Sequence, residues 1–126
     1  MMAVWNYTLR REWVIDMTLA DIYSMLTGIN GFENKVAYRA FPEGEAPALP
    51  FICYLDTQTY NFIADNKVYS VIQEIDIELY SKLKDTASEA LIEAAFAANS
   101  IVWEKYDDYL EDEKVYEVIY TITTNQ

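Results

Sequence analysis

Hydrophobic residues recur at helical spacing in two stretches of the chain. In the first, Thr18 is suited to cap a helix with Asp21 three residues later, and Gly28 can adopt the positive φ that ends one. The apolar stripe, spaced i, i+3, i+4 and i+7, consists of Leu19, Ile22, Tyr23 and Leu26. This pattern predicts a helix over residues 18–27.

The second helical stretch follows a capping-box sequence from Thr86 to Glu89, and Asn99 is placed to end it. We expect a helix over 86–98 whose small side chains allow close approach to a sheet. The residues of this surface are Leu91, Ile92 and Phe96 with Ala87, Ala90, Ala94, Ala95, Ala97 and Ala98.

Alternation of apolar and polar residues predicts strands in the rest of the chain. In residues 68–81, Ile75 and Ile77 point to one face while Asp76 and Glu78 point to the other. All three prolines lie in 41–50, which must be a loop because proline cannot donate to a sheet ladder. The predicted strands are 35–40, 51–57, 68–81, 101–106 and 115–124, and the acidic stretch 107–114 is predicted to be a hairpin loop.

These elements predict an α+β fold in the order α-β-β-β-α-β-β. Because most connections are short and lack a helical crossover, we expect a mostly antiparallel sheet of about five strands, flanked on one face by the two helices. The length of 126 residues suits one domain. We place that domain at 17–126, after an N-terminal extension or arm at 1–16, and we expect Met17 to be the natural start.

Aromatic residues lie near the tip of a predicted β-hairpin. The hairpin turns at the pair Asp65-Asn66, and Tyr60, Phe62 and Ile63 precede it. These side chains either fold back onto the core or contact another subunit. Two loop residues, Phe41 and Leu49, are further candidates for a subunit or partner interface.

The charge is strongly negative, with 9 Lys and Arg against 21 Asp and Glu and a net charge of −12. Such a chain repels DNA phosphate and anionic lipid. No apolar run is long enough to cross a bilayer. Carboxylates concentrate in 104–117, which is a solvated loop, a surface for a basic partner, or a wall past which DNA slides without binding.

The residue types exclude most catalytic chemistry. Without histidine, neither a Ser-His-Asp nor a Cys-His system can form, and the single cysteine cannot provide a zinc site. Three glycines are too few for a phosphate-binding loop. We expect Cys53 to pack as a small hydrophobic residue, and we expect no catalytic residues, metal or cofactor.

Four segments carry a family resemblance: residues 18–23 (TLADIY), 60–69 (YNFIADNKVY), 75–80 (IDIELY) with the following Lys84-Asp85, and 113–120 (EKVYEVIY). Together they resemble the tail-terminator, or tail-completion, proteins of long-tailed phages and prophages of Gram-positive bacteria. These are minor tail proteins that act in head–tail joining. The resemblance covers about residues 17–124.

The resemblance implies an antiparallel sheet with two flanking helices and a homo-oligomeric ring, usually a hexamer. Such a ring occupies the head-proximal end of the tail tube, where it stops polymerisation of the major tail tube protein and presents a surface to the head–tail connector. The implied location is the head–tail junction of a virion assembled in the bacterial cytoplasm. The implied role is structural rather than enzymatic.

DNA passes through such a ring without being gripped, so carboxylates are expected to line it. The candidates are the acidic stretch or the long strand, namely Asp107, Asp108, Glu111, Asp112, Glu113, Glu74, Asp76 and Glu78. Three alternatives remain open: a neck or adaptor protein of the same virion, an acidic DNA mimic that inhibits a nuclease, and a carboxylate-based enzyme.

Overall fold

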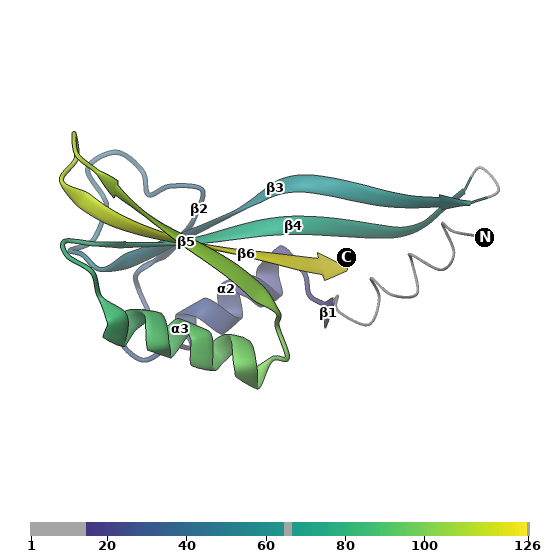
Figure 1. Ribbon diagram of the computed structural model, residues 1–126, viewed down its shortest axis with the longest axis horizontal. Helices are drawn as coiled ribbons and strands as arrows, with labels where there is room; N and C mark the ends of the chain where they lie inside the picture. Colours follow the sequence, from purple (N-terminus) through teal and green to yellow (C-terminus); the bar gives the residue numbers. More distant parts are fainter. Residues whose placement is uncertain (1–14, 65–66, 126) are drawn as a thin grey trace.

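Two helices and six strands make up the part of the chain that the computed structural model describes, residues 15–64 and 67–125. This confirms the predicted α+β class (Figure 1). The elements are β1 (Ile15–Asp16), α2 (Leu19–Thr27), β2 (Val36–Tyr38), β3 (Phe51–Ala64), β4 (Lys67–Ser81), α3 (Thr86–Ala98), β5 (Trp103–Leu110) and β6 (Val115–Asn125).

The strands form one mixed sheet in the order β1-β6-β4-β3-β2, with β5 also paired to β6. Three pairs are antiparallel, but β1 lies parallel to β6 and β2 lies parallel to β3. The expectation of a mostly antiparallel sheet of about five strands is therefore only partly correct. The loop between Tyr38 and Phe51 explains the difference, because it is long enough to return the chain so that β3 starts beside the start of β2.

The extra strand is β1, in which Ile15 and Asp16 pair with Thr124 and Asn125 at the end of β6. The Asn125 amide also donates to Asp16 at 2.9 Å. The last two residues of the proposed 1–16 extension thus belong to the sheet, whereas residues 1–14 lie outside the described residues. The domain boundary and the Met17 start stay predictions.

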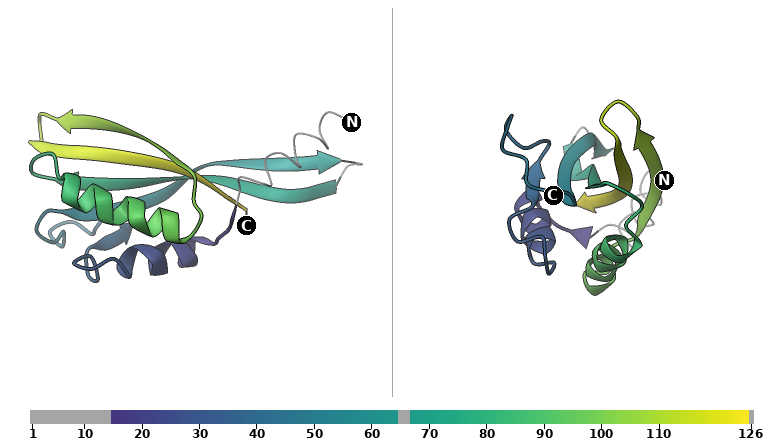
Figure 2. Two further views of the ribbon diagram at one scale, coloured as in Figure 1. Left: turned by 60° about the horizontal axis from the view of Figure 1, so that its bottom comes forward. Right: turned by 90° about the vertical axis from the view of Figure 1, so that its left-hand side faces the viewer.

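Both helices lie on the same face of the sheet, as predicted (Figure 2). The start of α2 is the predicted capping box: Thr18 Oγ1 accepts from the Asp21 amide at 3.1 Å, and Asp21 accepts from the Thr18 amide at 2.9 Å. The end of α2 differs, because Gly28 has a φ of −76°. The positive φ occurs at Gly31, after a further turn of chain.

Helix α3 has the predicted bounds but a different cap. The cap is Asp85, whose carboxylate accepts from the Ser88 amide at 3.0 Å and from the Ser88 hydroxyl at 2.7 Å. Thr86 is the first helical residue, so Glu89 does not serve a capping box and is free to point inward. Asn99 ends the helix as predicted.

The core lies between the two helices and the covered face of the sheet. Burial of Ile75, Ile77 and Leu79 confirms the predicted alternation of β4. Cys53 is also buried, as predicted. The largest fully buried side chains are Ile22, Leu26, Ile52, Ile75, Ile77, Leu79, Ile92, Phe96, Val118, Tyr120, Ile122 and Thr124.

Strands β3 and β4 continue beyond the rest of the sheet as a two-stranded ribbon, formed by 58–64 and 67–71. On one side β6 pairs with β4 only as far as Ile72, and on the other β2 pairs with β3 only to Tyr54. The ribbon projects from the body in Figure 1. The prediction that β3 ends at residue 57 is wrong, because pairing with β4 carries the strand seven residues further.

Candidate functional site: interaction surfaces

The face of the sheet that the helices leave uncovered is rich in carboxylates. Three strands supply them, because the residues that alternate with those facing the helices on β4, β5 and β6 point to this side. Among the described residues, no lysine or arginine belongs to this set. We call this surface the anionic face; its acids are Glu74, Asp76, Glu78, Glu104, Asp108 and Glu117.

The acids of the anionic face are close enough to influence one another. Glu117 is only 8% exposed. Burial of Glu78, followed by repulsion from Glu117 and Asp76, raises the pKa of Glu78. This holds even though the Tyr80 hydroxyl donates to Glu78 at 3.0 Å, which lowers the pKa. Partial burial and the same carboxylates raise the pKa of the Tyr106 phenol. The face therefore holds unneutralised negative charge at neutral pH.

The substitution Glu78→Gln tests this repulsion. A raised pKa means that ionised Glu78 costs stability at neutral pH and that the cost disappears as protonation occurs on acidification. We expect Glu78→Gln to raise the free energy of unfolding at pH 7 by roughly 0.5–1 kcal/mol and to have little effect below about pH 4. Urea denaturation at both pH values measures this, with the exposed turn residue Glu111 changed to Gln as the control. A gain that persists unchanged at low pH would contradict the electrostatic cause.

The acidic stretch predicted to be one loop is divided between three environments. Strand β5 runs through Asp107 and Asp108 to Leu110, so only 111–114 form the turn. Asp107 points to the helix side and Asp108 to the anionic face, while Glu111, Asp112 and Glu113 are exposed in the turn. The prediction of a loop over 107–114 is therefore wrong for residues 107–110, which belong to β5, and correct for residues 111–114. Strand pairing with β6 extends β5, because it satisfies the backbone of Asp107 and Asp108 despite their charge.

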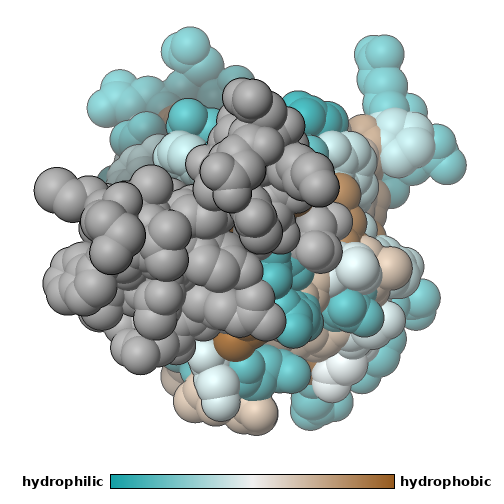
Figure 3. Space-filling model, turned by 90° about the vertical axis from the view of Figure 1, so that its right-hand side faces the viewer, coloured by the Kyte–Doolittle hydropathy of each residue, from teal (hydrophilic) through white to brown (hydrophobic). Residues whose placement is uncertain are grey.

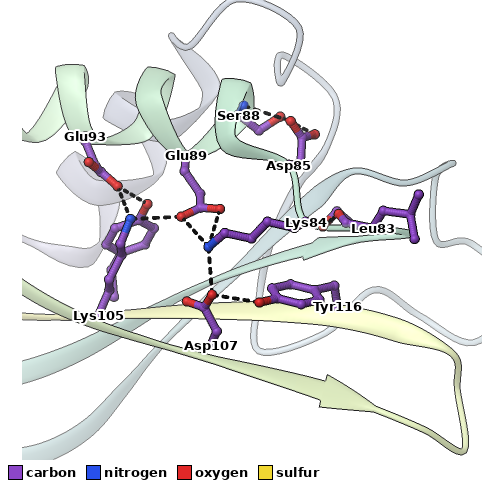
Figure 4. Close-up of polar contacts among 11 residues, drawn as sticks. Leu83, Lys84, Asp85, Ser88, Glu89, Glu93, Lys105, Asp107 and Tyr116 are labelled. Carbon is purple, nitrogen blue, oxygen red and sulfur yellow. Dashed lines mark hydrogen bonds and ion pairs between the residues drawn. The ribbon is translucent and has the colours of Figure 1, made fainter.

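A network of ion pairs joins α3 to β5 (Figure 4). The Lys84 ammonium lies 2.7 Å from Asp107 and 2.9 Å from Glu89, and the Lys105 ammonium lies 2.8 Å from Glu89 and 2.7 Å from Glu93. Glu89 is the buried centre of the network, with 3% exposure. Two tyrosine hydroxyls complete it: Tyr116 donates to Asp107 and Tyr120 donates to Glu93, each at 2.7 Å.

These contacts favour the charged form of the acids and of the lysine alike. The hydrogen bonds from Lys84 and Tyr116 lower the pKa of Asp107, and the hydrogen bonds that Lys84 donates to Asp107 and Glu89 raise the pKa of Lys84. Burial raises the pKa of Glu93, but the hydrogen bonds that Lys105 and Tyr120 donate to it have the larger combined effect, so the pKa of Glu93 is lowered. Every charged group of the network thus has a partner of opposite charge within it, so the network serves to hold α3 on the sheet.

Sequence reasoning did not find this network. A signal was present: Glu89 and Glu93 are four residues apart, so they lie on one side of α3. Nothing in the local sequence indicated that this side faces the sheet, since acids on a helix normally face water.

The outward side of α3 is correspondingly apolar. Five alanines predicted to contact the sheet are exposed instead, and of the six only Ala95 packs on the core. The expectation of a close alanine contact is wrong because the inward side is occupied by the buried residues and by Glu89 and Glu93. We call this surface the outer face of α3; it consists of Ala87, Ala90, Leu91, Ala94, Ala97 and Ala98.

A shallow hollow lies beside the first turn of α3. It has a volume of about 380 Å³, and its apolar lining includes Leu49, Pro50, Leu83 and Ala87. Leu83 is 75% exposed. The hollow therefore extends the apolar surface of α3 toward the β4–α3 connection.

The residues predicted for an interface are dispersed. Tyr60 is half-buried and donates to Glu74 at 3.2 Å. Phe41 packs edge-on against Phe51, with ring centroids 5.2 Å apart, and Leu49 lines the hollow. The side chains of Phe62 and Ile63 and the turn pair Asp65-Asn66 lie outside the described residues. Seen from the ribbon end, the coloured part of the surface, which belongs to described residues, intersperses polar and apolar residues (Figure 3).

The described residues contain no group of three or more Cys, Asp or Glu side chains arranged to hold a metal ion, and none of their helices could span a membrane. Comparison of the sequence with protein-family models and with curated proteins gives no match. What the protein does must therefore be argued from its surfaces: the anionic face, the outer face of α3 and the ribbon.

Proposed function

We propose that this protein is a structural tail-completion protein that works as a ring. In this proposal several copies, six by the resemblance, sit at the head-proximal end of a phage tail tube. The ring ends polymerisation of the tube protein and offers the surface to which the head–tail connector joins. Its place is the head–tail junction of the virion, after assembly in the host cytoplasm, and it carries out no enzymatic reaction.

The outer face of α3 carries the proposal. A surface helix normally turns its charged side to water, and a helix apolar all round is normally buried. Here both carboxylates of the helix, Glu89 and Glu93, face the body, while alanines and Leu91 face outward. This reversed polarity suits a helix that is buried on its outer side by a second copy of the chain.

The ribbon supports the same conclusion. A two-stranded hairpin is only marginally stable in water by itself, and no third described strand pairs with this one. Its sequence, with Phe62, Ile63, Val68 and Val71, is apolar enough to contact a neighbouring protein. In the proposed ring, the ribbon would extend from the subunit and contact the tube subunit.

The anionic face fits the passage of DNA. Carboxylates without neighbouring cations repel phosphate, so DNA moves past them without binding. Of the predicted candidates, Glu74, Asp76, Glu78 and Asp108 belong to this face, whereas Asp107 is neutralised by Lys84. We assign the four unneutralised acids to the wall of the proposed channel, together with Glu104 and Glu117.

Deletion of the gene from its phage or prophage tests the function. We expect overlong tails without heads in electron micrographs, with normal tails restored by the gene supplied in trans. Headless tails of normal length would overturn termination and favour a neck or adaptor role. Complete particles would overturn both and favour the acidic DNA mimic.

Two matched variants test the surface that carries the proposal. Ala94→Glu places a charge on the outer face of α3, and Ala20→Glu places the same charge on the exposed side of α2. We expect A94E to keep its circular dichroism spectrum but fail to complement the deletion, while A20E complements. Full complementation by A94E would show that the outer face of α3 is not buried in the assembly.

A further inference from the structure

Several edges of the sheet have no partner strand among the described residues, and two of them belong to β5 and β3. Strand β5 pairs with β6 on one side, and no described strand pairs with its other side. On the opposite border, β2 covers β3 only to Tyr54, so the stretch Leu55–Thr59 has no described strand beside it. An open edge presents unpaired amide and carbonyl groups that can pair with another chain.

We propose that the outer edge of β5 in one copy pairs with the Leu55–Thr59 edge of β3 in the next copy, so that the sheet continues from subunit to subunit. The occupant of each edge is thus a second copy of this chain. This inference rests on the proposed ring and names the contact that would close it. Because the two edges are different surfaces, the contact is head-to-tail, the type that generates rings.

The strand directions are compatible with this pairing. Strand β5 is antiparallel to β6, β6 to β4, and β4 to β3, so β5 and β3 run in opposite directions. Rotation about a ring axis along the strands preserves these directions. The junction is therefore an antiparallel pair, the more stable type per residue. Leu55–Thr59 has the length of an ordinary strand, with a bulge at Thr57 where the register with β4 shifts between Asp56 and Gln58.

Charge favours the head-to-tail contact over a two-fold one. Antiparallel pairing of β5 with a second β5 would place Glu104 and Asp108 of the anionic face near the same acids of the second copy, and like charges on neighbouring strands repel. The β3 edge contains no unneutralised acid: Thr57, Gln58 and Thr59 are neutral. The remaining acid, Asp56, accepts from the Tyr38 hydroxyl and lies 3.7 Å from Arg39.

The side chains at the two edges suit an interface. Tyr106 is 58% exposed on β5 and Tyr109 is also exposed, and tyrosine is enriched where proteins meet. A centred antiparallel pairing brings Gln58 opposite Tyr106, with both side chains on the uncovered face. Gln58 would then lie diagonally between Glu104 and Asp108 of the next copy.

Cysteine cross-linking tests the pairing. In a Cys53→Ala background, Gln58→Cys and Tyr106→Cys are prepared as separate proteins, mixed, and oxidised. We expect a disulfide-linked dimer in the mixture and none in either protein alone. A dimer from Tyr106→Cys alone would overturn the proposal in favour of two-fold β5 pairing. Absence of any cross-link up to the solubility limit would overturn it as well.

A charge series gives an independent readout by sedimentation velocity. We expect Gln58→Lys to strengthen self-association about two- to five-fold and Gln58→Glu to weaken it by a similar factor. Adding Glu104→Lys and Asp108→Lys to Gln58→Glu should restore association. Since these residues lie at opposite borders of the same sheet, restoration requires contact between copies, and its failure contradicts the pairing.

The two proposals fail separately. Oligomers that form without the 58–106 cross-link would overturn the edge pairing but leave the ring function intact. Cross-linked rings in a phage whose deletion leaves normal tails would support the pairing and overturn the function.

Discussion

The double variant Lys84→Met/Lys105→Met is expected to lose about 3–5 kcal/mol of unfolding free energy. The two ammonium groups are the cations bound to Glu89, whose side chain is almost fully buried between α3 and β5. Without them an ionised carboxylate remains buried and unpaired, which is far less favourable than a buried ion pair. Urea denaturation followed by circular dichroism measures the loss.

Two further variants show whether the buried charge is responsible. Adding Glu89→Met removes the unpaired carboxylate, and we expect it to recover most of the lost stability, because an apolar group of similar size can replace a buried ion pair. Lys82→Met/Lys114→Met makes the same change in net charge at exposed positions and should be nearly neutral. If the control variant lost as much unfolding free energy as Lys84→Met/Lys105→Met, the cause would be the change in net charge rather than the buried carboxylate of Glu89.

The network also sets a pH dependence. The pKa of Asp107 and that of Glu93 are lowered in the folded protein, so their stabilising effect is present at neutral pH and disappears as they take up protons on acidification. The difference in stability between the wild type and the double lysine variant should therefore shrink below about pH 4.

Phe96→Ala is expected to cost about 3–5 kcal/mol of unfolding free energy. Phe96 is fully buried, with its ring centroid 5.2 Å from that of Tyr120 and 6.4 Å from that of Trp103. Truncation leaves a cavity between α3 and the sheet, which the strands cannot fill without disrupting their pairing. A drop in the denaturation midpoint, with loss of near-ultraviolet signal from Trp103, is the expected observation.

Leu91, on the opposite side of α3, provides the control for the loss of stability caused by this cavity. Leu91→Ala also truncates a large apolar side chain in the same helix, but Leu91 lies on the outer face. In the isolated subunit we expect it to change stability by no more than about 0.5 kcal/mol. Equal effects at the two positions would mean that α3 is not oriented as described.

Local sequence predicted the helices well. The bounds of α3 are those expected, and those of α2 agree once Thr18 is counted as the cap, because helical spacing and capping depend on residues a few positions apart. The predictions were wrong where two nearby residues could each cap or end a helix. Asp85, a charged acceptor one position earlier, replaces Thr86 as the cap, and Gly28 stays in the right-handed conformation while Gly31 does not.

Strand lengths were less predictable, since a strand ends where its partner ends. Strand β3 continues to Ala64 because β4 pairs with it throughout, and β5 continues through Asp107 and Asp108 because β6 does the same. The parallel pairing of β2 with β3 likewise depends on the path of the intervening loop. A local sequence pattern does not indicate which strand, far away in the sequence, will pair with a segment.

By itself, the sequence determined the α+β class, both helices, the two faces of β4 and the absence of histidine chemistry, because each follows from residue type or short-range periodicity. Only the tertiary structure decided which carboxylates are neutralised. Asp107 and Asp108 are neighbours in the chain, yet the pleat of β5 directs one to Lys84 and the other to the anionic face. The same three-dimensional arrangement turned the acids of α3 inward and its alanines outward, because the lysines that bind those acids come from other elements.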